Sequence, residues 1–186
     1  MRIISGTARG KQLRTFKTKA IRPTSDRVRE ALFNILTSKI GDLYDLNVLD
    51  ICAGTGALGL EALSRGARRS VFIDSSRHAT ELIAHNSRAC NVEEHAEIIR
   101  GGFSSALPRL AGSVFELIFI DPPYDKDMLP EIISLISDLD LLALGGIICA
   151  EEGKKAQVNP DIGLYTCFDT RKYGDTCIYL FSADAE

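Results

Sequence analysis

Several common features are missing from this sequence, and each absence narrows the class of protein. The five cysteines include no CxxC pair, and the three histidines have no metal-ligand spacing with them. An odd number of scattered cysteines argues against disulfides and a zinc site, so we expect reduced thiols and no bound metal. Residues 1–5 carry no secretory apolar segment, and the longest apolar run, which two glycines interrupt at 141–150, is too short to span a bilayer. These absences predict a cytoplasmic protein without a membrane partner.

Length and organisation favour one domain. The chain has 186 residues, which is enough to bury a full core and few for two domains. It contains no internal repeat and no low-complexity linker. We therefore expect a single domain over residues 1–186, with a basic N-terminal extension and helix at 1–40 and a nucleotide-binding core at 46–182.

Charge is distributed unevenly along the chain. Residues 1–29, which we call the basic arm, hold nine basic side chains and one acid, Asp26, a balance of +8. Because the whole chain has a net charge of −3, the rest of it carries −11. An acidic body with a basic arm suggests that the arm binds a polyanion, and a merely solubilising arm is the alternative.

The most informative stretch is NVLDICAGTGALGLEALSR at residues 47–65. A short apolar run ends in Asp50, a glycine-rich turn follows at 54–56, and apolar residues then recur at helical spacing. Strand, glycine turn and helix in this order form the nucleotide-binding half of a doubly wound α/β fold. Glycine is used there because a ligand approaches the backbone more closely than a Cβ allows. A tight connection without a ligand is the alternative.

The remaining chain alternates between short apolar runs and helical patterns, which predicts a mostly parallel sheet of seven strands. Two β-rich runs near the end flank Lys172-Tyr173-Gly174-Asp175 and predict an antiparallel hairpin at the sheet edge. Near the start, glycines predict a hairpin or loop, and a helix follows in which Arg27 and Arg29 lie off the apolar stripe. The expected strands are 47–50, 70–73, 96–100, 115–120, 146–150, 164–168 and 176–181, and the expected helices begin near 26, 57, 80 and 129.

The glycine turn alone does not identify its ligand. Residues 54–59 satisfy GxGxxG, and Asp74 lies near the spacing of a ribose-binding acid, so NAD is a real alternative. Asp50 favours S-adenosylmethionine. A carboxylate at that position would attract the cationic amino group of this cofactor, whereas it would repel the pyrophosphate of NAD.

A second motif, Asp121-Pro122-Pro123-Tyr124, follows the apolar strand at 115–120. Ligands of open α/β sheets bind at the carboxyl ends of the strands, where this motif lies. Its prolines stiffen the turn and remove two backbone donors. An acid, a free carbonyl and an aromatic face on one turn suit an exocyclic amine on a flat base, with the base stacked on Tyr124. A proline-rich turn that merely caps the strand is the alternative.

The chain resembles the RsmD family, the bacterial 16S ribosomal RNA guanine-N2 methyltransferases, over nearly its whole length. The glycine motif and the DPPY motif are common to many amino-methyltransferases, whereas the two N-terminal blocks are specific to this family. The matching blocks are RIISGTARGKQL at 2–13, RPTSDRVREALFNIL at 22–36, DICAGTGALGLEALSRGA at 50–67, DPPY at 121–124 and RKYGDT at 171–176.

The resemblance implies a Rossmann-like methyltransferase fold, S-adenosylmethionine as cofactor and three groups of site residues. It places Asp121, Pro122, Pro123 and Tyr124 on the target base. It assigns the cofactor to Asp50, Ala53, Gly54, Thr55, Gly56, Asp74 and Ser75, with the backbone of Gly102 and Phe103 near the adenine because an acid is missing there. We expect RNA contacts from Arg2, Arg9, Lys11, Arg22, Thr24, Arg27 and Arg29, although Arg22 and Thr24 could instead close over the cofactor.

The function expected from these features is S-adenosylmethionine-dependent methylation of guanine N2 in 16S ribosomal RNA. The resemblance implies a substrate within a small-subunit assembly particle, and we expect a monomer. Adenine-N6 methylation of DNA or RNA is the alternative within this chemistry, because DPPY serves both bases. An NAD-dependent oxidoreductase is the alternative from another class, and an RNA-binding protein without catalysis is a third.

Overall fold

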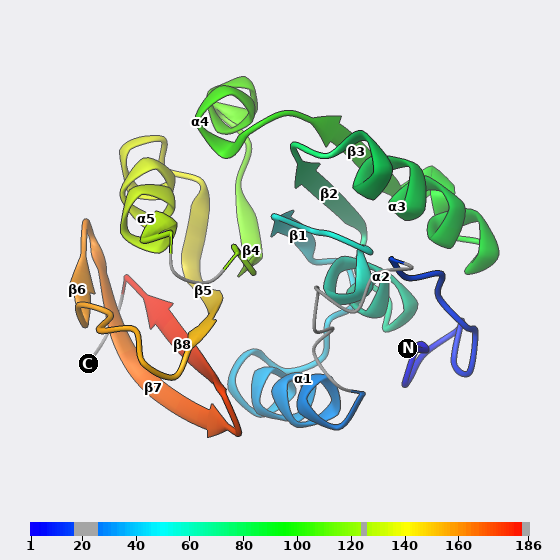
Figure 1. Ribbon diagram of the computed structural model, residues 1–186, viewed down its shortest axis with the longest axis horizontal. Coiled ribbons are helices and arrows are strands. Elements are labelled where there is room, and N and C mark those ends of the chain that lie inside the picture. Colours follow the sequence, from blue (N-terminus) through cyan, green and yellow to red (C-terminus); the bar gives the residue numbers. More distant parts are fainter. Residues whose placement is uncertain (17–25, 124–125, 184–186) are drawn as a thin grey trace.

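A computed structural model describes residues 1–16, 26–123 and 126–183 (Figure 1). Arg22, Thr24 and Tyr124, which the sequence assigned to the site, lie outside the described residues. No helix in the described part of the chain is long and apolar enough to cross a membrane.

One eight-stranded sheet organises the molecule, with the strand order β3-β2-β1-β4-β5-β8-β7-β6. Five strands pair in parallel from β3 to β5, and the last three pair antiparallel. The predicted mostly parallel sheet with a C-terminal hairpin is therefore confirmed. The eighth strand is β6, which has only two residues and therefore too short an apolar run to be recognised. The strands are β1 (Asn47–Ile51), β2 (Arg69–Asp74), β3 (Ala96–Arg100), β4 (Phe115–Ile120), β5 (Leu142–Gly153), β6 (Asp161–Ile162), β7 (Tyr165–Tyr173) and β8 (Thr176–Ser182).

Helices cover both faces of the sheet (Figure 1). Apolar side chains of α1 (Asp26–Ile40), α2 (Ala57–Ser64) and α3 (Arg77–Ala89) join one core cluster. Those of α4 (Phe103–Ala106) and α5 (Met128–Asp138) join the other, with the 3-10 turn η2 (Leu107–Leu110). A second 3-10 turn, η1 (Glu93–His95), leads into β3. Strand β4 lies between the two layers, which is why it is almost entirely apolar.

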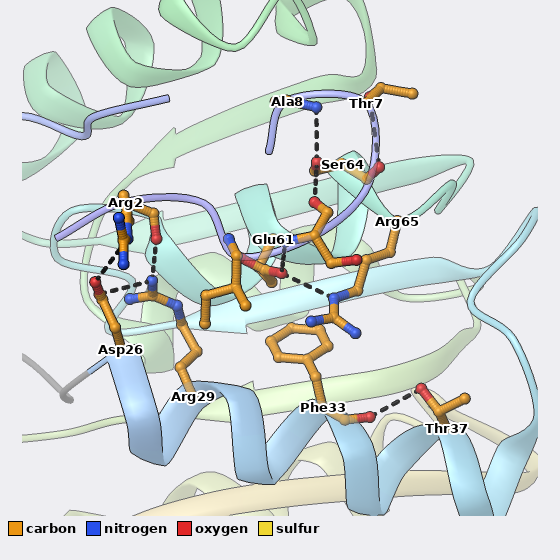
Figure 2. A network of polar contacts seen from close by, with 12 residues as sticks. Arg2, Thr7, Ala8, Asp26, Arg29, Phe33, Thr37, Glu61, Ser64 and Arg65 are labelled. Carbon is orange, nitrogen blue, oxygen red and sulfur yellow. Dashed lines mark hydrogen bonds and ion pairs between the residues drawn. The ribbon is translucent and has the colours of Figure 1, made fainter. Parts of the chain in front are cut away.

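The start of the basic arm is a folded loop that hydrogen bonds hold against α2. This agrees with the hairpin or loop predicted for these residues. A bridge pairs Arg2 with Gln12. The backbone N–H groups of Ile4 and Ser5 donate to the two carboxylate oxygens of Glu61, at 2.8 and 3.0 Å. Figure 2 shows this network, in which Ser64 also accepts a hydrogen bond from the Ala8 backbone. The arm is thus held by buried polar groups of the helix that follows the glycine turn.

The structure contradicts one expectation about α1. Arg29 is fully buried, and its guanidinium donates to the Arg2 carbonyl and to Asp26 (Figure 2). The predicted position of Arg29 off the apolar stripe is wrong because residues 29, 32, 33 and 36 follow one another at helical spacing on the buried face. A guanidinium enclosed in this way does not reach an RNA phosphate, whereas Arg27 is exposed as expected.

Candidate active site

A cavity of about 650 Å³ lies at the carboxyl ends of the parallel strands. This is the edge at which doubly wound folds bind ligands, and the size suits a small organic molecule. Most of the described residues that the sequence assigned to cofactor and base line this one cavity. They are Asp50, Ala53, Gly54, Thr55, Asp74, Ser75, Gly102, Phe103, Asp121, Pro122 and Pro123.

The two glycines of the turn have different roles. Both adopt positive φ, 56° at Gly54 and 76° at Gly56. A Cβ built on Gly54 would make only ordinary van der Waals contacts, at 3.9 Å from the Cys52 carbonyl and from the Phe16 ring, and Gly54 lines the cavity. A Cβ on Gly56 would press within 3.3 Å of Ile83 and Leu60. Gly56 does not line the cavity. It is the N-cap of α2, and its lack of a side chain lets this end of the helix pack closely against Ile83 of α3.

Asp74 orders the glycine turn as well as facing the cavity. Its Oδ2 accepts a hydrogen bond from the Gly54 N–H at 2.9 Å, and its Oδ1 accepts one from the Ser76 N–H at 2.8 Å. Ser76 in turn caps α3. One carboxylate at the end of β2 therefore fixes both the turn and the start of the next helix.

Asp50 is nearly enclosed at the end of β1. Its Oδ2 accepts a hydrogen bond from the Gly59 N–H in α2 at 2.9 Å. The pKa of Asp50 is raised to about 8, mainly by burial. The Gly59 hydrogen bond partly offsets this effect, and the nearby charge of Asp74 adds to it. The carboxyl is therefore poised to ionise near neutral pH when a positive charge enters the cavity.

Asp121 follows β4 directly and is half-buried. Its backbone N–H donates to the Ile51 carbonyl at 3.2 Å, which fixes the turn against β1. Burial raises the pKa of Asp121 well above its usual range, and the charges of Glu151, Asp50 and Glu152 add to this effect in that order. Pro122 is buried and Pro123 is exposed, so the turn is anchored on one side and open on the other.

The structure also places in the cavity residues that the sequence did not indicate. Glu151 comes from β5, and Met1, Thr15 and Phe16 come from the basic arm. Glu151 had a visible signal, because it follows an apolar strand as Asp121 does. The arm residues had none, since their position depends on contacts with a distant helix.

The β3–α4 turn meets the cavity through Gly102 and Phe103. The Gly102 carbonyl already accepts hydrogen bonds from the backbone of Ser105 and Ala106, at 3.1 and 3.0 Å. It therefore serves mainly to begin α4. A role for this carbonyl toward an adenine amino group is correspondingly disfavoured.

The cavity wall is strongly acidic. Asp50, Asp74, Asp121 and Glu151 all line it. In the part of the chain that the structure describes, the basic side chains on the wall are the enclosed Arg29 and the exposed Lys126. Such a wall favours a ligand with positive charge and disfavours a pyrophosphate.

Comparisons with known proteins agree with this geometry. A family model described as "Conserved hypothetical protein 95" matches residues 1–182. Ribosomal RNA small subunit methyltransferase D of Escherichia coli (strain K12) is 37% identical over 151 residues, covering 81% of this chain and 74% of the relative. The enzyme of that name from Haemophilus influenzae is 32% identical over 164 residues, covering 87% and 83%. The solved structure of the Escherichia coli protein yhhF superposes with a TM-score of 0.83 at 31% identity, covering 100% of this chain and 99% of the other.

Proposed function

Because the chain belongs to the RsmD family of ribosomal RNA methyltransferases, we propose that it methylates the exocyclic N2 of a guanine in small-subunit ribosomal RNA, with S-adenosylmethionine as cofactor. One observation carries this proposal. Asp121, Pro122 and Pro123 line the same cavity as the glycine turn, so a base and a cofactor can meet there. When bound, the cofactor supplies an electrophilic methyl group on a positively charged sulfur.

The residues present fit that cofactor. Gly54 lines the cavity without a side chain, so a ligand can approach its backbone. Asp74 has carboxylate oxygens that can also accept from ribose hydroxyls. The acidic wall around Asp50 suits the ammonium and sulfonium charges.

The target base would be held by the turn after β4. The Asp121 carboxyl and the Pro122 carbonyl offer acceptor oxygens for amino hydrogens, and we assign the stacking surface to Tyr124. Such acceptors hold the amine in place and stabilise positive charge on its nitrogen. The protein thus contributes orientation and electrostatics at one edge of the sheet.

Two alternatives are less well supported. Adenine-N6 methylation would use the same acceptors, but the family relationship favours ribosomal RNA. An NAD-dependent oxidoreductase would be expected to have the all-parallel order 3-2-1-4-5-6, whereas here the antiparallel β8 follows β5. The acidic wall also disfavours the pyrophosphate of NAD.

Asp74→Ala is expected to weaken binding of S-adenosylhomocysteine by about 1.5–3 kcal/mol, the range for a hydrogen bond to a charged group. The substitution removes the acceptor for the ribose and loosens the Gly54 end of the turn. Calorimetric titration measures the effect. Asp74→Asn keeps one acceptor oxygen and should lose less, so equal affinity in wild type and Asp74→Ala would remove Asp74 from the cofactor site.

The affinity for S-adenosylmethionine should rise with pH up to about 8. Below that pH the Asp50 carboxyl, whose pKa is raised to about 8, is mostly neutral in the free protein. A cationic ligand favours its ionised form, so binding releases a proton and tightens as pH rises. Adenosine lacks both the ammonium and the sulfonium charge and is the matched control. Titrations from about pH 6 to 9 should show the ratio of the two affinities increasing with pH, and a constant ratio would contradict this account.

The affinity for RNA should depend on the exposed cations of the basic arm. We propose phosphate contacts from Arg2, Arg9, Lys11 and Arg27, which are exposed, and from Arg22 with Thr24. Arg9→Ala and Lys11→Ala should each reduce the slope of log affinity against log salt by about 0.7–0.9. Arg109→Ala is the control, because Arg109 is exposed and lies in η2, which belongs to the core cluster on the other side of the sheet from the arm. Unchanged slopes in the arm variants would make the arm a solubilising segment.

Methyl transfer itself can be tested with small ribosomal subunits from a strain that lacks the gene. Subunits incubated with the protein and labelled S-adenosylmethionine should gain about one methyl group each. Protein-free RNA should be the poorer substrate, because we propose an assembly particle as the natural one. No incorporation into either substrate would contradict the proposed function.

A further inference from the structure

A buried asparagine in α3 joins two parts of the site that are far apart in sequence. Asn86 is fully enclosed, and its Oδ1 accepts a hydrogen bond from the Arg14 N–H at 2.8 Å. Its Nδ2 donates to the carbonyl of Arg14 at 3.1 Å and to the carbonyl of Thr55 at 3.0 Å. This orientation of the carboxamide satisfies all three backbone partners at once.

These bonds connect the basic arm to the glycine turn. Arg14 belongs to the arm, and Thr55 is the middle residue of the turn. The next two arm residues, Thr15 and Phe16, line the cavity. The Phe16 ring lies 3.9 Å from the position of a Cβ on Gly54 and meets the ring of His78 edge-on, with centroids 5.3 Å apart. The arm therefore reaches the cofactor cavity at the point where Asn86 holds it.

We infer that Asn86 is a positioning residue that couples RNA binding by the basic arm to cofactor binding at the glycine turn. This inference rests on the proposed function. A shift of the arm would break the pair of bonds to Arg14 and reorient the amide that supports the Thr55 carbonyl. A buried amide tolerates few alternative arrangements, because each lost partner leaves a polar group without water. Order in the arm and order in the turn therefore favour each other.

Such coupling is reciprocal, so it can be measured from either ligand. The affinity for small ribosomal subunits from the gene-deletion strain would be measured by filter binding, with and without saturating S-adenosylhomocysteine. Wild type should bind the subunits about fivefold tighter or more with the cofactor product present. In Asn86→Asp the carboxylate keeps an acceptor for Arg14 but cannot donate to either carbonyl, so this ratio should fall to about one. The ratio compares one variant with itself, so a loss of stability alone does not change it.

Ser87→Ala is the matched control. Ser87 is the neighbouring buried polar residue of α3, and among the described residues its hydroxyl donates to the Ala84 carbonyl in the same helix. This variant should keep the wild-type ratio. Phe16→Ala provides a second test that leaves Asn86 intact. Its ratio of subunit affinities with and without S-adenosylhomocysteine should also fall to about one, because the substitution removes the arm's contact beside Gly54.

A wild-type ratio of one, or a wild-type ratio retained in Asn86→Asp or in Phe16→Ala, would overturn the inference. Subunits that gain no methyl group from the wild-type protein would instead contradict the proposed function. The two failures are therefore distinguishable.

Discussion

Asp121→Ala is expected to lower kcat by about 10²–10³, the usual effect of removing one group that stabilises developing charge, whereas Asp121→Asn retains substantial activity. The lone pair of guanine N2 is delocalised into the ring, so the amine is a poor nucleophile. Its protons are too weakly acidic for a carboxylate to remove before attack. Asp121 is therefore expected to act as an acceptor that orients the amine and stabilises positive charge on nitrogen, and asparagine keeps an acceptor oxygen.

The environment of Asp121 supports this asymmetry. Burial and the neighbouring Glu151 raise the pKa of Asp121 well above its usual range. A neutral carboxyl keeps one carbonyl oxygen as an acceptor, as the amide of asparagine does, so this environment is consistent with a role that needs an acceptor oxygen and no full negative charge. Single-turnover kinetics of both variants would measure the effect, and unchanged affinity for S-adenosylhomocysteine is the control. Equal losses in the two variants would mean that the negative charge itself, or general-base chemistry, is required.

Glu61→Ala is expected to lower the free energy of unfolding by about 3–5 kcal/mol, the cost of removing one partner from a buried ion pair. The fully buried carboxylate accepts from the N–H groups of Ile4 and Ser5 and from Arg65 at 2.8 Å. Arg65 is itself stacked on the Phe33 ring, 4.6 Å from its centroid. The substitution leaves two backbone donors and a mostly enclosed guanidinium without their acceptor, and it releases the arm from α2.

The chain contains a matched control for this prediction. Arg77 and Glu81 form an ion pair with the same distance of 2.8 Å and the same four-residue separation, but both side chains are exposed. Glu81→Ala should therefore cost only about 0.3–0.5 kcal/mol. Chemical denaturation of the two variants measures the difference. Similar losses would show that burial of Glu61 contributes little to fixing the arm.

Local patterns predicted the elements that build the site. The apolar strand at 115–120, the glycine turn and the acids that end β1, β2 and β4 were all recognisable, because each depends on residues close together in sequence. Strand β5 begins at Leu142, four residues before the expected start. Gly145 lay outside the expected strand, whereas the structure includes it in a strand whose register shifts against β4.

Contacts between distant segments explain what the sequence did not predict. No local pattern marks Glu61 or Asn86 as buried, yet both are fully buried and accept hydrogen bonds from the backbone of the basic arm. Arg29 was misplaced for a related reason, since its enclosed position requires the carbonyl of Arg2 as a partner. Glu151 joins the cavity because β5 pairs with β4, a strand order that local patterns do not determine.

The central claim, guanine-N2 methylation of small-subunit ribosomal RNA, is tested most directly by identifying the modified nucleoside. Small subunits from the gene-deletion strain would be incubated with the purified protein and S-adenosylmethionine, digested to nucleosides and analysed by mass spectrometry. Our account predicts a gain of N2-methylguanosine in RNA from treated subunits and none with Asp121→Ala over the same short incubation. A gain of N6-methyladenosine instead, or of no methylated nucleoside, would contradict it.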